Sequence, residues 1–277
     1  MKKIFFFFLI SFFLNQTAFS KDLVFADKAV KFDMSAGISN KLFLPAVQKN
    51  LNPALILLPA CSGIHAYSET AMKNWSKLFI DSGYFVLVVD HYRQRNAGKN
   101  CGRARTVSFD RLTKDIYDAT IHLSKIPGVD KNRIFSFGFS LGTMANGWAA
   151  SKNKYNRIAK GMLRPRALGG LYGGCAYGKN KEKRFLFSDT DIPLIWLMGS
   201  KDKESPPGDC KYILKNISKK IKVESFIYDG ATHSWDVQAL DGFKKIAGNG
   251  QSVTYRYNEN VTKDSMKRAL EFFNSFK

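Results

Sequence analysis

A serine between two glycines, in the pattern Gly-x-Ser-x-Gly, is the first feature of this sequence that could carry chemistry. The serine is Ser140, within the run from Gly138 to Gly142. The apolar, aromatic-rich residues 132–137 before it predict a buried strand, and residues 141–150 after it predict a helix. At a sharp turn between a strand and a helix, small flanking residues allow the serine hydroxyl to project from the end of the sheet. The pattern therefore places Ser140 where a nucleophile is expected.

Asp202 and His233, each just after a later predicted strand, could activate this serine. In an open parallel sheet, reactive groups gather beyond the carboxyl ends of the strands. Serine is a weak nucleophile at its own pKa, so it needs a base within hydrogen-bond reach, and a third group must fix the tautomer of that base. We expect His233 to be the base and Asp202 the orienting acid. The chain order serine, acid, histidine is that of an α/β-hydrolase triad.

Other acids and histidines could also reach this cleft. They are Asp209 and Asp236, either of which could be the orienting acid, and His65 and His91, which lie in loops at strand ends. The fourth histidine, His122, is expected on the surface of a helix. Only His233 follows the last strand of the predicted sheet, which favours it as the base.

Acyl transfer also requires hydrogen-bond donors for the oxyanion that forms during the reaction. One donor is expected to be the backbone N–H of Leu141, the residue after the nucleophile. The second should come from the loop after the apolar strand at 55–58, where Cys61 is the first choice and Ser62 the second. A donor of this kind is typically worth about 2.7 to 4 kcal/mol of the barrier. This chemistry needs no cofactor.

Strands alternate with helices along the rest of the chain. The predicted strands lie at 22–26, 30–34, 41–46, 53–59, 84–89, 132–137, 167–172, 193–198 and 222–228. The predicted helices lie at 68–81, 110–126, 141–154, 206–219 and 261–276. The first three strands are expected to form an antiparallel lead-in, and the strand at 222–228 is expected to be the last one of the central sheet. This alternation predicts an α/β fold with a mostly parallel sheet and helices on both faces, in one domain over residues 21–277.

The first twenty residues have the features of a secretory signal peptide. A basic start at Lys2 and Lys3 precedes a mostly apolar run at 4–14, and residues 18–20 fit a cleavage site after Ser20. The apolar run is too short to span a bilayer comfortably, and no later run is long enough. The mature chain is therefore expected to be soluble and exported, either to a periplasm or as a secreted protein.

The chain carries a strong positive charge. Its formal net charge is +20, and loss of Lys2 and Lys3 with the leader leaves +18. Such a charge favours non-specific attraction to anionic surfaces such as lipid headgroups, acidic polysaccharide or nucleic acid. No aromatic-interleaved RNA motif or zinc-finger spacing accompanies the basic residues, so specific nucleic-acid binding is not expected.

Four cysteines follow the leader. They are Cys61, Cys101, Cys175 and Cys210. In an exported chain an even number of cysteines suggests disulfides, here two with three possible connectivities. No Cys-x-x-Cys pair occurs, so neither a metal site nor a thioredoxin-like redox pair is predicted.

An ordered set of segments resembles the dienelactone hydrolase family of α/β-hydrolases over about residues 51–275. The segments are 59–63, 83–90, 138–142, 172–175, 199–202 and 230–233. The resemblance implies hydrolysis of esters or lactones, with Ser140, Asp202 and His233 as the triad. It also implies which loops are neighbours at the active-site end, and thereby two disulfides. These pair Cys61 with Cys101 and Cys175 with Cys210.

The sequence departs from the family pattern at two positions that matter for chemistry. The enzymes that give the family its name use a cysteine nucleophile and a glutamate in the oxyanion loop. This chain has Ser140 instead, and residues 59–63 contain no acid. These differences argue against dienelactone itself as the substrate.

The sequence as a whole predicts an exported serine hydrolase that cleaves a carboxylic ester or lactone through an acyl-enzyme on Ser140. Its partner would be a small-molecule substrate. One alternative is acyl transfer to a nucleophile other than water, which the same residues could support. The other is a non-catalytic basic binding protein built on a hydrolase fold, although such a protein has no need of the full set of serine, acid and histidine.

Overall fold

A seven-stranded sheet forms the centre of the computed structural model, which describes residues 25–26, 28–97, 101, 106–177, 184–217 and 219–276. The strands lie in the order β1-β3-β2-β4-β5-β8-β9. All neighbours in this sheet are parallel except β1 and β3. The strand bounds are β1 Leu42–Phe43, β2 Asn52–Leu58, β3 Phe85–Val88, β4 Val129–Phe139, β5 Ala167–Leu171, β8 Leu194–Gly199 and β9 Val223–Tyr228. The signal peptide expected at 1–20 lies outside the described residues.

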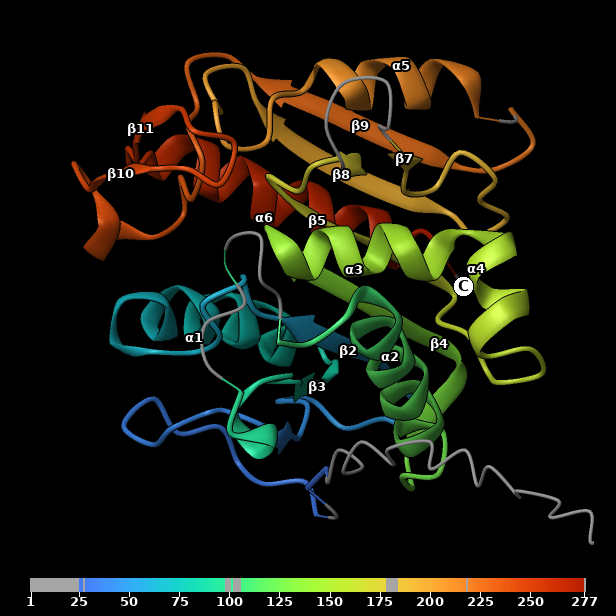
Figure 1. Ribbon diagram of the computed structural model, residues 1–277. Helices are drawn as coiled ribbons and strands as arrows, with labels where there is room; N and C mark the ends of the chain where they lie inside the picture. The colour runs from blue at the N-terminus through green and yellow to red at the C-terminus, as the bar shows by residue number, and fades with distance from the viewer. Residues whose placement is uncertain are drawn as a thin grey trace, which may run out of the picture.

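Helices cover both faces of this sheet, as the sequence predicts (Figure 1). Their bounds are α1 Ala66–Asp81, α2 Phe109–Leu123, α3 Leu141–Ala150, α4 Lys152–Ile158, α5 Gly208–Asn216 and α6 Glu259–Asn274. One apolar core joins α2, α3 and α5 to one face through residues such as Ile116, Ala145 and Ile213. A second joins α1 and α6 to the other face through residues such as Trp75 and Phe273. The predicted α/β fold with a mostly parallel sheet is confirmed.

Strand β2 shows why a strand that is buried on both faces has an unbroken apolar run in its sequence. Successive side chains of a strand point to opposite faces. Leu55 and Leu57 belong to the core under α1 and α6, whereas Ile56 and Leu58 belong to the core under α2 and α3. All four side chains are fully buried. A strand with helices on both sides has no polar face, so it shows no alternation of apolar and polar residues.

The start of the predicted sheet and one predicted helix differ from the structure. The strand expected at 30–34 is wrong, because only Val30 pairs, in an isolated bridge to Phe43. Among the described residues, the antiparallel lead-in is reduced to the two residues of β1, and residues 22–24 of the strand expected at 22–26 lie outside them. The last strand of the sheet is β9, as expected, and it lies at the edge, where its residues 224–226 are exposed. The single helix expected at 141–154 is split, because Ser151 leaves helical geometry and caps α4.

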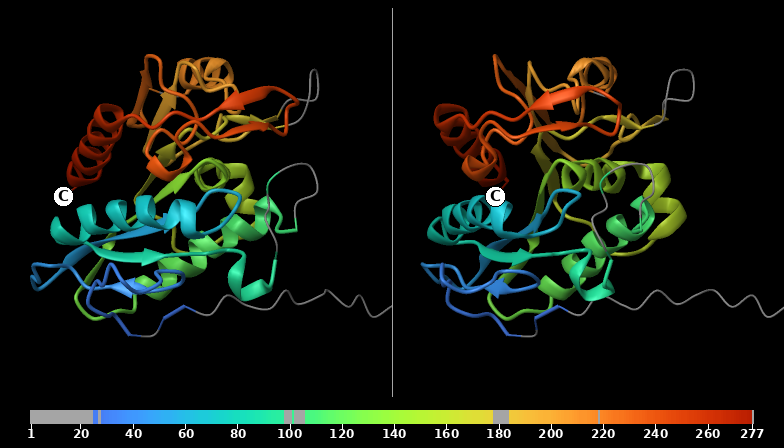
Figure 2. Two further views of the ribbon diagram at one scale, coloured as in Figure 1. Left: turned by 90° about the vertical axis from the view of Figure 1, so that its left-hand side faces the viewer. Right: turned by 60° about the vertical axis from the view of Figure 1, so that its left-hand side comes forward.

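Two small hairpins were not predicted. They are β6 Ala176–Tyr177 with β7 Arg184–Phe185, and β10 Lys244–Ile246 with β11 Ser252–Thr254. The second hairpin lies on the same side of the molecule as α1, at left in Figure 1 and toward the viewer in the left panel of Figure 2. It follows the short 3₁₀ helix η3 Gln238–Leu240. The second hairpin and η3 add a wall to the end of the sheet where the strands β4, β8 and β9 terminate.

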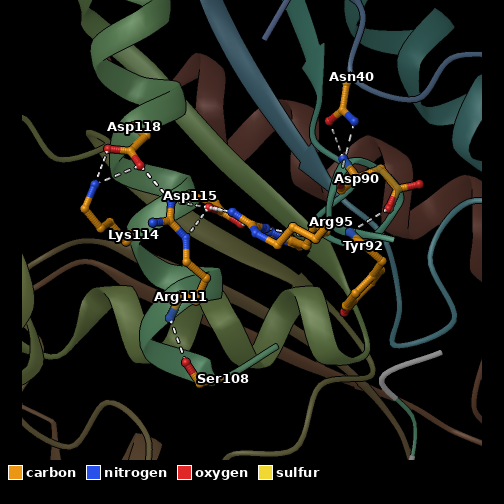
Figure 3. A network of polar contacts seen from close by, with 10 residues as sticks. Asn40, Asp90, Tyr92, Arg95, Ser108, Arg111, Lys114, Asp115 and Asp118 are labelled. Carbon is orange, nitrogen blue, oxygen red and sulfur yellow. Dashed lines mark hydrogen bonds and ion pairs between the residues drawn. The ribbon is translucent and has the colours of Figure 1, made fainter. Parts of the chain in front are cut away.

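A buried ion network fixes the segment after β3 (Figure 3). The carboxylate of Asp115, on α2, is fully buried and accepts hydrogen bonds from Arg95 and Arg111 at 2.5 to 2.8 Å. Nδ1 of His91 lies 2.8 Å from the same carboxylate. Arg95 belongs to the short 3₁₀ helix η1 Arg93–Arg95 and also donates to the carbonyl of His91 at 2.7 Å. The network therefore ties the chain leading to Cys101 onto α2.

Two disulfides join loops at this end of the sheet. Cys61, after β2, is bonded to Cys101, and Cys175, after β5, is bonded to Cys210 in α5. These are the pairs that the family resemblance implies. Each bond closes a loop of 40 or 35 residues between segments that follow different strands.

Candidate active site

The turn between β4 and α3 holds Ser140 in a backbone conformation that few non-glycine residues adopt. Its φ is 51° and its ψ is −109°. The glycines on either side are required by close packing. A Cβ on Gly138 would lie 2.3 Å from the carbonyl carbon of Gly142, and a Cβ on Gly142 would lie 2.6 Å from the carbonyl oxygen of Leu58. The sharp turn that the sequence predicted is therefore present, and close packing against the surrounding backbone stabilises its strained conformation.

Ser140, His233 and Asp202 form a hydrogen-bonded line across three loops, which follow β4, β9 and β8. Nε2 of His233 lies 2.9 Å from Oγ of Ser140, and its Nδ1 lies 2.7 Å from Oδ2 of Asp202. The other oxygen of Asp202, Oδ1, accepts the backbone N–H groups of Glu204 and Ser205, both at 2.8 Å. In this arrangement His233 can accept the proton of Ser140, and Asp202 can stabilise the imidazolium that results.

Opposing effects set the pKa of His233. Burial disfavours the imidazolium and alone would lower the pKa. The negative charge and hydrogen bond of Asp202, aided by the charge of Glu204, outweigh burial and raise the pKa above its ordinary value. Lys245 opposes them by lowering it. The other ionisable groups around the ring are Asp236, Tyr172 and Tyr255.

The two expected oxyanion donors lie on adjacent loops. Cys61 follows β2 and lines the same cavity as Ser140, together with Ser62. Leu141 is the first residue of α3. Within the described part of the chain, neither the N–H of Cys61 nor that of Leu141 donates to a protein acceptor. Two N–H groups without an internal acceptor are what an anion-binding site requires.

A cavity of about 480 Å³ opens beside Ser140 and His233. One wall comes from residues 59–62 and the first turns of α1, and the other from residues 234–245. The floor includes Phe139 and Tyr172. The volume and the mostly apolar lining are typical of a small-molecule site.

The alternative acids occupy different positions. Asp236 is buried in the cavity wall, where Oδ1 accepts the hydroxyl of Tyr172 at 2.8 Å and Oδ2 accepts Nε1 of Trp75 at 2.9 Å. Burial raises the pKa of Asp236. Asp209 lies in the first turn of α5. In the structure, Asp202 is the carboxylate that contacts Nδ1 of His233.

The other three histidines contact groups outside the line of Ser140, His233 and Asp202. His65 caps α1 and lines the cavity, with Nε2 3.0 Å from Oγ of Ser62. His91 belongs to the buried network around Asp115. His122 was expected on a helix surface but is partly buried, with Nε2 3.0 Å from the carbonyl of Ala26.

Sequence reasoning missed a group of residues beside His233. Glu204 accepts the hydroxyl of Tyr255 at 2.6 Å and Nζ of Lys245 at 3.0 Å, and all three line the cavity. Lys245 lies on β10 and Tyr255 follows β11, so these contacts attach the hairpin to the loop that carries Asp202. The pair Asn249-Gly250 between the two strands is a turn signal that could have revealed the hairpin.

Within the described ranges, no three residues of the types His, Cys, Asp and Glu form a group that could hold a metal ion. Likewise, none of the helices that the structure describes is long and apolar enough to cross a bilayer.

The model of the dienelactone hydrolase family matches residues 40–277. The comparison with curated proteins gives no match. A solved Klebsiella pneumoniae protein assigned as a dienelactone hydrolase is 16% identical, with a TM-score of 0.62 over 83% of this chain and 90% of that one. Esterase 2 of Thermogutta terrifontis, phosphonylated by cyclosarin, is 12% identical, with a TM-score of 0.59 over 85% and 88%. A dienelactone hydrolase-like promiscuous phosphotriesterase from metagenomic libraries is 14% identical, with a TM-score of 0.58 over 83% and 88%.

Proposed function

Because the chain belongs to the dienelactone hydrolase family and is thus a hydrolase acting on ester bonds, we propose that it is a serine hydrolase with the triad Ser140, His233 and Asp202. The observation that carries this proposal is the hydrogen-bonded line from Oγ of Ser140 through the imidazole to Asp202. The substrate is a carboxylic ester or lactone.

The mechanism follows from the positions of the three side chains. Oγ of Ser140 attacks the ester carbonyl while Nε2 of His233 takes its proton, and Asp202 stabilises the imidazolium. The backbone N–H groups of Cys61 and Leu141 bind the oxyanion of the tetrahedral intermediate. His233 then protonates the departing alcohol, which leaves an acyl group on Ser140. A water molecule, deprotonated by His233, hydrolyses this acyl-enzyme and restores the serine.

We also propose that the chain works outside the cytoplasm as one domain over residues 21–277. The two disulfides suit an oxidising compartment, either a periplasm or the exterior. The basic start, apolar run and small-residue cleavage pattern of residues 1–20 supply the export signal.

Labelling with a fluorophosphonate tests the activated serine directly, because this reagent forms a stable adduct with such a serine. The phosphonylated state of the Thermogutta esterase motivates the choice. Intact mass should show one adduct on the wild type and none on Ser140→Ala or His233→Ala. The matched controls are His122→Ala, on α2, and Ser124→Ala, at the residue that caps α2, and both should label like the wild type.

An adduct that persists on folded Ser140→Ala would overturn the proposed nucleophile. A folded, oxidised wild type that takes no adduct would favour the non-catalytic binding protein instead. Hydrolysis assayed with and without added alcohols or amines distinguishes a hydrolase from an acyltransferase that uses the same triad.

A further inference from the structure

The cavity beside Ser140 contains a chamber with apolar walls from three parts of the chain. The apolar residues that form it are Ala71, Met72, Phe139, Val237, Leu240 and Phe243. Ala71 and Met72 belong to α1, whereas Val237 and Leu240 lie before and within η3 on the facing wall. None of these residues belongs to the triad or supplies an oxyanion donor. The chamber is therefore available to the part of a substrate that is not reacting.

Among the residues that the structure describes, the charged groups of the chamber offer no site for an anion. Lys245 is the one lysine or arginine among the lining residues that the structure describes, and its Nζ is 3.0 Å from Oε1 of Glu204. The same ammonium lies 5.1 Å from the centre of the Tyr255 ring. Asp236 adds a second carboxyl group to the wall. A substrate carboxylate would meet two acidic side chains and a cation that is already paired.

The buried polar atoms of the back wall already have partners within the protein. Each oxygen of Asp236 accepts a hydrogen bond, one from Tyr172 and one from Trp75. Trp75 and Tyr172 also belong to the core behind the chamber. An apolar group can thus occupy the chamber without leaving these atoms unsatisfied.

The apolar surface continues to the mouth of the chamber. Tyr67 and Phe243 line the cavity and are 59% and 46% exposed. They stand on opposite walls, at the start of α1 and between η3 and β10. An apolar group that reaches out of the chamber would still contact these two rings.

We propose that this enzyme selects uncharged esters with an apolar acyl group of several carbons, which the chamber between α1 and the 237–243 segment holds. The proposal rests on the proposed function of Ser140 as the nucleophile. It names the substrate class of that site: neutral medium-chain or aryl esters, with anionic esters excluded.

Steady-state hydrolysis of p-nitrophenyl acetate, butyrate and hexanoate measures the apolar selection. Each methylene that leaves water should raise kcat/KM by about fourfold until the chamber is full. A second pair, p-nitrophenyl pentanoate against mono-p-nitrophenyl glutarate, measures the effect of one carboxylate on a chain of similar length. The neutral ester should have at least a tenfold higher kcat/KM.

Filling the chamber should weaken the preference for long acyl groups. Ala71→Leu places three additional carbons in the wall and should lower the hexanoate-to-acetate ratio of kcat/KM by at least tenfold. Ala239→Leu, on η3, should act in the same direction, and because Ala239 is exposed this variant does not disturb the core. Ala46→Leu is the matched control, since Ala46 is exposed and bonds to the far end of α1 through Ile80. Its ratio should equal that of the wild type.

The outcomes distinguish failure of the proposed substrate class from failure of the proposed nucleophile. Ester hydrolysis that requires Ser140 but prefers acetate, or that accepts the glutarate ester equally well, overturns the substrate class and leaves the nucleophile intact. A ratio unchanged in both Ala71→Leu and Ala239→Leu overturns the location of the acyl group. No hydrolysis of any ester, or full hydrolysis by Ser140→Ala, overturns the proposed function and this proposal with it.

Discussion

Asp202→Asn should lower kcat strongly, because the backbone around Asp202 determines which way the new amide points. Oδ1 of Asp202 accepts two backbone N–H groups, from Glu204 and Ser205, while Oδ2 faces Nδ1 of His233 at 2.7 Å. In the variant, the amide oxygen must occupy the Oδ1 position, since an NH₂ group there would oppose two donors. The NH₂ group then faces Nδ1 of His233. The ring must accept this hydrogen bond and keep its proton on Nε2, where it cannot accept the proton of Ser140.

The size of the effect follows from the two N–H groups. To restore the productive tautomer, the amide must flip, which leaves both donors without an acceptor at about 1 to 3 kcal/mol each. A penalty of about 2 to 6 kcal/mol corresponds to a fall in kcat of about 30- to 20,000-fold.

The assay is p-nitrophenyl butyrate hydrolysis at saturating substrate, with circular dichroism to establish that each variant is folded. Asp209→Asn serves as the matched control, because Asp209 lies in the first turn of α5 while Asp202 is the carboxylate that contacts Nδ1 of His233, and its kcat should equal that of the wild type. A folded Asp202→Asn enzyme with kcat within tenfold of the wild type would refute the reasoning.

Two further predictions concern charge. Hydrolysis needs neutral His233, and Glu204 raises the pKa of His233 whereas Lys245 lowers it. Glu204→Gln should therefore move the acid limb of the kcat/KM profile to lower pH and Lys245→Gln to higher pH; shifts in the same direction would contradict this. Asp115→Asn should lower the free energy of unfolding by about 3 to 5 kcal/mol, since it removes the partner of buried cations. Burial opposes ionisation of Asp115, but His91 and its arginine partners hold its pKa at about 2, below the unfolded value of about 3.9. The wild type should thus lose this stability as the pH falls from about 4 to 2, whereas Asp115→Asn should not. Urea unfolding at pH 7 and pH 3 measures both free energies of unfolding. An equal change between the two pH values in wild type and variant would contradict this prediction.

Sequence patterns by themselves determined the elements that position the site. The apolar runs at β2 and β8 predicted buried parallel strands because such strands lack a polar face. Gly138 and Gly142 predicted the sharp turn at Ser140, because close backbone contact there leaves no room for a Cβ. These features are visible in runs of a few consecutive residues, so local reasoning reached them. The start of the chain was harder to predict, because residues 30–34 have strand-like composition but find only one pairing partner.

Tertiary structure alone decided which side chains meet. Asp202, Asp209 and Asp236 were all acceptable acids in the sequence, and only the packing of the loops after β8 and β9 brings Asp202 to Nδ1 of His233. The contacts of Glu204 with the β10–β11 hairpin join residues 41 and 51 positions apart, which no local pattern encodes. The chamber likewise depends on α1 facing η3 across a distance of more than 150 residues in sequence. A local sequence pattern indicates where a residue lies within its own helix or strand. A site is formed by segments that meet only after the chain has folded.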